Sequence, residues 1–240
     1  MMTNKINVLV LCDDQWHPAE VIKRGMADWK CEDIFFDYMQ NPEMMLTPDM
    51  LERYPVVMIC KGNSINASNS TPWFQEKVTE TGPNELEQYV KSGGALLVVH
   101  GGTSFSVNDI SRKEMRFVKP CEQYIKLIGN SFQGHPPRNM IQIHVMQQEH
   151  PIMKNVQNFI VRDEQYQIHI LDNDIEQLFE TQSIESGEKA IGGYVKNLEK
   201  GRICVITLGH TLQVWRNEEF KKIITNAIRW SYEVQGEADG

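Results

Sequence analysis

Short apolar segments rich in valine and isoleucine recur along the chain and are separated by more polar stretches. Six of them stand out, at residues 6–11, 34–38, 56–59, 95–99, 141–145 and 203–207. Continuous apolar runs of this length are typical of strands buried on both faces of a sheet. In residues 83–91 and 218–232, apolar side chains instead repeat at helical spacing. Strands that alternate with helices predict an α/β fold with a doubly wound, mostly parallel sheet.

The less regular parts of the chain predict loops rather than a boundary between domains. Residues 104–119 and 130–139 carry Gly, Pro, Asn and Ser between short apolar pieces, and we expect them to fold over the sheet edge. The last residues, 235–240, are polar and are expected to fray. At 240 residues, the chain therefore predicts one α/β domain over 1–234 and a short tail.

Composition excludes several classes of protein. A net charge of −8 argues against electrostatic binding to nucleic acid or to an anionic membrane. No apolar run approaches the roughly 18 residues that a membrane helix needs. Five scattered cysteines without a CxxC spacing favour a reducing compartment, and residues 1–5 lead into a strand without an export signal. We expect a cytoplasmic protein.

The most informative position for chemistry is His100, which follows the apolar run 95–99 and precedes Gly101 and Gly102. Ligands of doubly wound sheets bind beyond the carboxyl ends of the strands. Many hydrolases and amidotransferases place a Ser or Cys nucleophile at the equivalent strand-to-helix elbow. Here a titratable imidazole occupies that place, so the interpretation of the site depends on what surrounds it.

The other histidines differ in how strongly their context favours a function. His210 follows Gly209 and another predicted strand, so it should reach the same edge of the sheet as His100. His135 lies between Gly134 and Pro136, and a functional and a structural role stay equally open. His17 follows the first predicted strand and could face the same crevice, although a loop histidine is usually solvated. The other three are expected to be structural: His144, His150 and His169.

Residues 163–166 place two carboxylates, Asp163 and Glu164, beside Tyr166. Carboxylates near neutral imidazoles form either an acid–base pair or part of a metal shell, although a solvated acidic turn would have the same spacing. Signatures of a serine or cysteine nucleophile (Gly-x-Ser-x-Gly, Gly-x-Cys-x-Gly) and of phosphate-binding loops are absent from the sequence.

Taken together, an ordered set of motifs resembles the ThuA-like family, named for trehalose utilisation. The set runs through GGALLVVH (93–100), FQGHP (132–136), EHPI (149–152), DEQY (163–166), GRICVITLGHT (201–211) and NAIRW (226–230). It covers roughly residues 93–232, whereas the first 90 residues fit only in the order of strands and helices. The segment 63–81, which contains Trp73 and Phe74, departs from the family pattern.

The resemblance implies a flavodoxin-like sheet of the class I glutamine amidotransferase type without the amidotransferase cysteine. It further implies a role in the catabolism of trehalose, related disaccharides or keto-sugars. The resemblance also strengthens Glu164, because the family's Asp-Glu-x-Tyr motif falls on Asp163, Glu164 and Tyr166. The residues that we expect to be catalytic are His100, Glu164 and His210, which are also the candidate ligands of Zn²⁺ or another divalent metal. The residues expected to contact a substrate are Gly101, His135, Asp163, Tyr166 and Trp215.

Two functions from different classes remain open at this point. One is an enzyme (a hydrolase, lyase or isomerase) that acts on a sugar or sugar derivative, through a bound metal or through proton transfer by His100 and Glu164. The other is a non-catalytic module that binds a sugar or scaffolds a partner. Glutamine amidotransferase activity is not expected, although Cys12 and Cys60 end other strands. The partner expected is a small sugar, with a homodimer as a further expectation.

Overall fold

A computed structural model describes residues 5–14, 16–40, 42–62, 81–104, 106–108 and 118–237. A nine-stranded sheet forms its centre, in the hydrogen-bonded order β2-β1-β3-β4-β13-β12-β11-β8-β9. The first five strands in this order are parallel: β2 (Ile34–Met39), β1 (Ile6–Leu11), β3 (Val56–Ile59), β4 (Ala95–Val99) and β13 (Gly201–Ile206). The other four continue it in antiparallel fashion: β12 (Lys189–Leu198), β11 (Glu176–Ser183), β8 (Asn139–Val145) and β9 (Phe159–Asp163).

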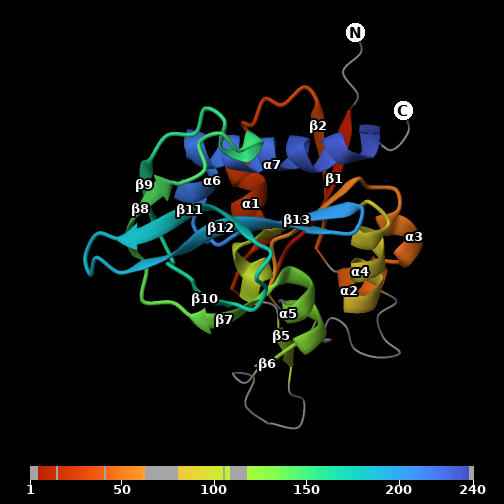
Figure 1. Cartoon of the computed structure of the whole chain (residues 1–240), viewed down its shortest axis with the longest axis horizontal. Coiled ribbons are helices and arrows are strands. Elements are labelled where there is room, and N and C mark those ends of the chain that lie inside the picture. Colours follow the sequence, from red (N-terminus) through yellow and green to blue (C-terminus); the bar gives the residue numbers. More distant parts are fainter. Residues whose placement is uncertain are drawn as a thin grey trace.

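Helices cover both faces of the sheet, as the doubly wound prediction requires (Figure 1). One face packs against α1 (Ala19–Met26), α6 (Leu212–Trp215) and α7 (Glu218–Glu237). The other packs against α2 (Pro42–Met45), α3 (Pro48–Leu51), α4 (Pro83–Lys91) and α5 (Glu122–Ile128). The predicted fold class is confirmed: a mixed α/β sheet with a parallel centre.

Alternation along the parallel strands explains why they appear as continuous apolar runs. In β1, Val8 and Val10 belong to one buried cluster, and Leu9 and Leu11 belong to the other. The same division holds in β4, where Leu97 and Val99 face one set of helices and Leu96 and Val98 face the other. Because both faces exclude water, every position of such a strand favours an apolar side chain.

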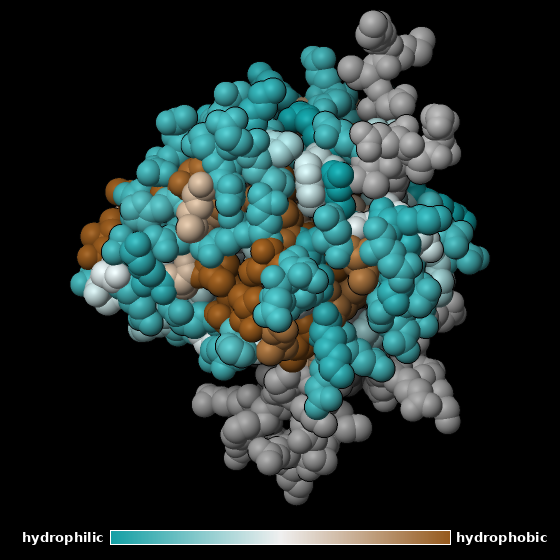
Figure 2. Space-filling model, viewed as in Figure 1, coloured by the Kyte–Doolittle hydropathy of each residue, from teal (hydrophilic) through white to brown (hydrophobic). Residues whose placement is uncertain are grey.

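Four short strands and two 3₁₀ turns complete the described chain. The strands β7 (Asn130–Gly134) and β10 (Gln167–Ile170) pair with each other, as do β5 (Ser106–Asn108) and β6 (Val118–Pro120). Two 3₁₀ turns follow β4 and β8, at His100–Ser104 and Pro151–Met153. Figure 2 shows apolar side chains in the centre of the face on which β10, β12 and α5 lie in Figure 1.

Three expectations about local structure need correction, and two others cannot be followed. Residues 130–134, predicted to be loop, form strand β7, because their backbone pairs with β10. Residues 106–108 and 118–119, also predicted to be loop, lie in strands β5 and β6, which pair with each other. The last helix continues through Glu237, so residues 235–237 of the predicted tail are helical. Residues 63–80, with Trp73 and Phe74, lie outside the described residues, as do residues 109–117. None of the helices within the described ranges has the length and apolar character that a membrane crossing requires.

Candidate functional site at the carboxyl edge of the parallel strands

His100 lies at a strained turn directly after β4. Its φ angle is 43°, in the left-handed region that side chains other than glycine rarely adopt, and the 3₁₀ turn begins at this residue. The turn lies so close to β3 that a Cβ on Gly102 would be 2.2 Å from the carbonyl oxygen of Ile59. This is the backbone geometry of a nucleophile elbow, a sharp strand-to-helix turn that exposes one side chain beyond the sheet.

The His100 ring is held in one tautomer. Its Nδ1 lies 2.8 Å from the carbonyl oxygen of Thr207, which can only accept, so Nδ1 carries the proton and donates it. The Nε2 lone pair therefore points the other way, where Glu164 Oε2 is 3.5 Å distant. Nε2 is buried and has no hydrogen-bond partner.

His210 is positioned by Asp163, which is completely buried at the end of β9. Its carboxylate accepts the backbone N–H groups of Gly209, His210 and Thr211 at 2.8, 3.1 and 3.2 Å. Burial raises the pKa of Asp163 to about 6, with the backbone hydrogen bonds acting in the opposite direction. Three strands (β12, β11 and β8) separate β9 from β13 in the sheet, so these hydrogen bonds join two distant strand ends.

Trp215 also supports the loop that carries His210. It is 1% exposed, and its Nε1–H donates to the carbonyl oxygen of Gly209 at 2.7 Å. Asp163 and Trp215 were both expected to contact a substrate; the structure places them behind the loop that carries His210, where they hold that loop in position.

Glu164, the residue after β9, is the point on which the histidines converge. Its Oε2 lies 3.2 Å from His210 Nδ1, 3.4 Å from His135 Nε2 and 3.5 Å from His100 Nε2. Burial acts to raise its pKa, but the close imidazoles of His100, His210 and His135 outweigh that effect and lower the pKa to about 2. The carboxylate is therefore ionised at neutral pH, and its 12% exposure leaves it open to solvent on one side.

His17 joins this cluster, contrary to the expectation of a solvated loop histidine. Its ring is 9% exposed and lies 5.0 Å from the His100 ring and 5.5 Å from the His210 ring. The close approach depends on Gly101, because a Cβ there would be 2.6 Å from His17 Nδ1. The role of Gly101 in the structure is thus to admit the His17 ring.

Asp14 fixes the orientation of His17. Both carboxylate oxygens lie 2.9–3.0 Å from His17 Nδ1, so this nitrogen donates and Nε2 faces the cluster. Burial alone would raise the pKa of Asp14, but the His17 hydrogen bond and the backbone N–H of Gly62 outweigh it, and the pKa falls to about 2. A sequence signal existed: Asp14 and His17 follow β1 at the same sheet edge as His100.

Tyr166 and His135 form the outer side of the site. Tyr166 is buried with its ring 4.1 Å from the His100 ring, and its hydroxyl lies 3.3 Å from His17 Nε2. The His135 ring stacks on Tyr166 with an interplanar angle of 19°. Its side chain is more exposed than those of His17, His100 and His210. His150, in contrast, caps the second 3₁₀ turn and contacts Trp230, away from the cluster.

Burial keeps the inner imidazoles neutral. It lowers the pKa of His100 to about 4, against the opposing effect of Glu164, and it lowers the pKa of His210 to about 4 with a further contribution from His100. One ligand atom from each of His17, His100, Glu164 and His210 lies within 4.8 Å of all the others. Neutral ring nitrogens beside a carboxylate can accept protons or bind a metal ion.

The cysteines near this edge are poorly suited to nucleophilic attack. Burial raises the pKa of Cys12, at the end of β1, to about 12, and it raises the pKa of Cys60, after β3, well above its ordinary value. A thiol of this kind stays protonated at neutral pH, and the thiolate is the nucleophilic form. Neither residue replaces the missing amidotransferase cysteine.

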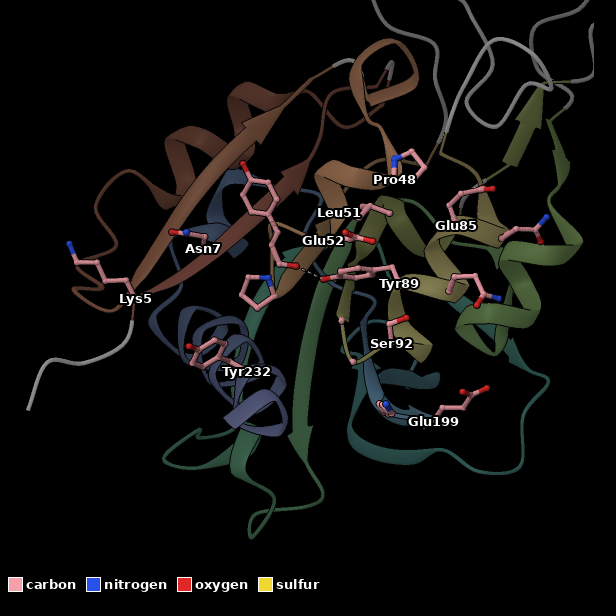
Figure 3. A pocket seen from close by; sticks show the side chains of 17 residues that line it. Lys5, Asn7, Pro48, Leu51, Glu52, Glu85, Tyr89, Ser92, Glu199 and Tyr232 are labelled. Atoms are coloured by element: carbon pink, nitrogen blue, oxygen red, sulfur yellow. Dashed lines mark hydrogen bonds between the residues drawn. The ribbon is translucent and has the colours of Figure 1, made fainter. Parts of the chain in front are cut away.

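A cavity of about 1080 Å³ lies at the opposite edge of the sheet, where the parallel strands begin. Figure 3 shows its lining, which includes Lys5 and Asn7 of the β1 end and Tyr89 and Glu85 of α4. Two of its polar side chains are bonded within the protein: Tyr89 donates to the Tyr54 carbonyl oxygen at 2.9 Å, and Glu85 accepts the Gly82 N–H at 2.8 Å. The histidine–carboxylate cluster lies at the other edge of the sheet, away from this cavity.

Comparison with known proteins gives a family and a fold. The model of the family described as "ThuA: Trehalose utilisation" matches residues 8–231. Two ThuA-like proteins of known structure share this architecture. The one from Bacteroides uniformis has a TM-score of 0.68 and 15% identity, over 96% of this chain and 93% of its own. The one from Parabacteroides merdae has a TM-score of 0.63 and 16% identity, over 95% of this chain and 90% of its own.

A glutamine amidotransferase from Thermotoga maritima has the same fold, with a TM-score of 0.53 and 11% identity over 97% of this chain and 86% of its own. At these levels of identity, the structural likeness concerns the fold alone. No curated protein matches the sequence. The fold expected from the motifs is confirmed.

Proposed function

The chain belongs to the ThuA family of trehalose-utilisation proteins, and from this premise we propose that it converts a sugar or sugar derivative at the histidine–carboxylate site. The substrate class we favour is an oxidised sugar that carries a keto group. The observation that carries the proposal is the convergence of three imidazoles on one carboxylate oxygen, each within 3.2–3.5 Å of Glu164 Oε2.

The chemistry follows from the protonation states of these groups. Neutral His100 offers a lone pair at Nε2, and ionised Glu164 offers a second proton acceptor beside it. A carbon next to a carbonyl group is the position in a sugar from which a proton is most readily removed. Transfer of that proton to His100 or Glu164, and its return to a neighbouring atom, isomerises the sugar without any further reactant.

His135 and Tyr166 extend the site outward. His135 is 33% exposed at its side chain, and its Nδ1 lies 2.9 Å from the carbonyl oxygen of Pro136. Its Nε2 lies 3.4 Å from Glu164 Oε2, where we propose that it accepts a hydrogen bond from a hydroxyl group of the sugar. In our proposal these two residues bind the sugar, whereas His100, Glu164 and His210 act on it. The five cysteines are free thiols, which supports a reducing compartment such as the cytoplasm.

A substrate screen tests the proposal. The purified protein would be incubated in D₂O with trehalose, related disaccharides and their keto derivatives, and products and deuterium incorporation would be followed by NMR and mass spectrometry. We expect conversion of at least one keto-sugar, with loss of conversion in His100→Asn and Glu164→Gln. Asparagine suits position 100 because it tolerates a positive φ.

The matched control is His169→Gln, since His169 is exposed on β10 and lies outside the site. Conversion that persists in both site variants would show that the chemistry lies elsewhere. Thermal stabilisation by a sugar without any product would instead favour a non-catalytic sugar-binding module.

A further inference from the structure

We propose that His17, His100, Glu164 and His210 bind one divalent transition-metal ion of the Zn²⁺ class, and that Asp14 and the carbonyl of Thr207 orient two of these ligands. This inference deepens the proposed function and rests on it for the purpose that the metal serves. Metal binding itself can be measured without a substrate.

The spacing of the ligand atoms is the first argument. In a tetrahedral site with metal–ligand bonds of 2.0–2.2 Å, neighbouring ligand atoms lie about 3.4 Å apart. The distances from Glu164 Oε2 to His210 Nδ1 and to His100 Nε2 are 3.2 and 3.5 Å, close to that value. All four ligand atoms lie within 4.8 Å of one another, so small side-chain rotations would bring them around one ion.

The second argument concerns buried nitrogens without partners. His100 Nε2 and His210 Nδ1 are both shielded from solvent, and neither makes a hydrogen bond. Buried polar atoms in folded proteins are nearly always satisfied, so each such atom needs an explanation. Both nitrogens face the same carboxylate, and an ion bound between them would satisfy the two together.

The third argument is the support behind the ligands. Histidines that bind metals usually donate their second ring N–H to a carboxylate or a backbone carbonyl, which fixes the tautomer and the direction of the lone pair. His17 Nδ1 donates to Asp14, and His100 Nδ1 donates to the Thr207 carbonyl oxygen. Both forms of support are present, and in both cases Nε2 is the ring nitrogen that faces the cluster. A bound metal ion would replace the contact of His17 Nε2 with the Tyr166 hydroxyl at 3.3 Å.

The donor set indicates the class of metal. Three imidazole nitrogens and one carboxylate oxygen suit Zn²⁺, Co²⁺, Ni²⁺ or Fe²⁺, whereas Mg²⁺ and Ca²⁺ prefer a shell of oxygen atoms. Such an ion would polarise a carbonyl oxygen of the substrate. His135 lies nearer to solvent than the four proposed ligands, and we leave it outside the metal shell.

Direct titration tests the inference. The whole protein would be purified without a metal-chelating column, stripped with EDTA, and titrated with ZnCl₂ by calorimetry and with CoCl₂ by visible spectroscopy. We expect one equivalent of Zn²⁺ that survives desalting, and a ligand-field spectrum of Co²⁺ that Zn²⁺ displaces. Binding well below one equivalent with Zn²⁺, Co²⁺ and Ni²⁺ would overturn the inference.

Variants locate the site. Glu164→Gln and His210→Gln should weaken Zn²⁺ binding by at least about 100-fold, because each removes a ligand. Asp14→Asn should weaken it about 10–100-fold, the range typical of a lost supporting residue. His17→Gln provides a second test of the same side of the site should Asp14→Asn fail to fold, which circular dichroism of the metal-free protein would reveal. The control, His169→Gln, should bind as the wild type does, and wild-type binding in all four site variants would contradict the proposal.

The two proposals can fail separately. If the stripped protein binds none of Zn²⁺, Co²⁺ and Ni²⁺ and still converts a keto-sugar, the metal inference is wrong and the proposed function stands. If Zn²⁺ binds at one equivalent and no sugar derivative is converted with or without it, the metal site stands and the proposed function is wrong.

Discussion

The carboxyl ends of the parallel strands hold two buried imidazoles and a half-buried one around a carboxylate, whereas their amino ends border a cavity of about 1080 Å³ lined by tyrosine, lysine and glutamate. At the amino edge, Tyr89 and Glu85 have hydrogen-bond partners inside the protein. At the carboxyl edge, His100 and His210 each keep a buried nitrogen without one. Unsatisfied polar groups that a fold maintains at a stability cost are a better sign of function than volume.

The largest difference between the edges should appear in activity. Glu164→Gln removes the charge on which the histidines converge, and conversion of the keto-sugar found by the screen should fall about 10²- to 10⁴-fold, the range for a lost acid–base group. Glu199→Gln, at the amino-edge cavity, should leave the rate within about twofold because it touches no reacting group. Steady-state kinetics of the two variants would check this. Equal losses in both would remove the distinction between the edges.

The next difference should appear in the pH dependence of stability. The folded pKa values of His100 and His210 are about 4, whereas an unfolded histidine titrates near pH 6.5. Between these values the unfolded chain binds protons that the folded site excludes, so the free energy of unfolding falls as the pH falls, by up to about 3 kcal/mol for each histidine. Asp163, with a folded pKa raised to about 6, takes up its proton in the folded state and opposes part of this loss.

Urea unfolding at pH 7 and pH 4.5 measures the effect. His100→Asn should lose less stability on acidification than the wild type. Asparagine does not titrate, so the unfolded variant takes up one proton fewer than the unfolded wild type. His169→Gln should lose as much as the wild type. An unchanged difference in His100→Asn would show that this ring is protonated equally in both states.

A smaller difference is expected when a glycine at each edge is replaced by alanine and the free energies of unfolding are compared. A Cβ at Gly102 would meet the backbone of Ile59 at 2.2 Å, so Gly102→Ala should destabilise the fold by about 1–3 kcal/mol. At Gly93, by the amino edge, a Cβ has nothing closer than 4.0 Å, and only the positive φ of 115° opposes substitution. Gly93→Ala should therefore cost about 1 kcal/mol. Chemical denaturation would rank the two, and the reverse order would contradict the tight packing of the elbow.

The smallest effect should come from Tyr89→Phe. The hydroxyl donates to Tyr54 and accepts from the Ala95 N–H, which also donates to Pro55. Its loss should lower the free energy of unfolding by about 1 kcal/mol and leave the activity unchanged. A marked loss of activity with a small loss of stability would instead give the amino-edge cavity a part in function.

Most of the parallel half of the fold could be predicted from the sequence, because strands buried on both faces are continuous apolar runs such as residues 95–99. Strands β11 and β12 were missed, since they mix polar and apolar residues. β12 even contains Gly192 and Gly193, which make room for the ring of Phe179 on the neighbouring strand. That requirement depends on pairing between strands and leaves no local pattern in the sequence.

In the site, too, residues with a local sequence signal could be predicted, and contacts between distant residues could not. His100, Glu164 and His210 could be proposed because each follows a predicted strand or a motif. The position of His17 after the first strand left its place at this edge open, but its burial could not be predicted. That burial depends on the missing Cβ of Gly101, some 84 residues along the chain, and on the carboxylate of Asp14. Asp163 and Trp215 were placed in the right region, but only the structure shows that they bond to the backbone of the His210 loop.

The hydrogen bonds of Asp163 also bear on when the site forms during folding. The four principal residues of the site, His17, His100, Glu164 and His210, are spread over most of the chain. Asp163 joins the end of β9 to the loop after β13 across three intervening strands. A ligand of this site therefore cannot nucleate a local turn, as an ion held by neighbouring residues does. Closing such distant contacts is slow and comes late. Occupancy of the site would thus report that the entire sheet has assembled, and a nascent or truncated chain would not bind.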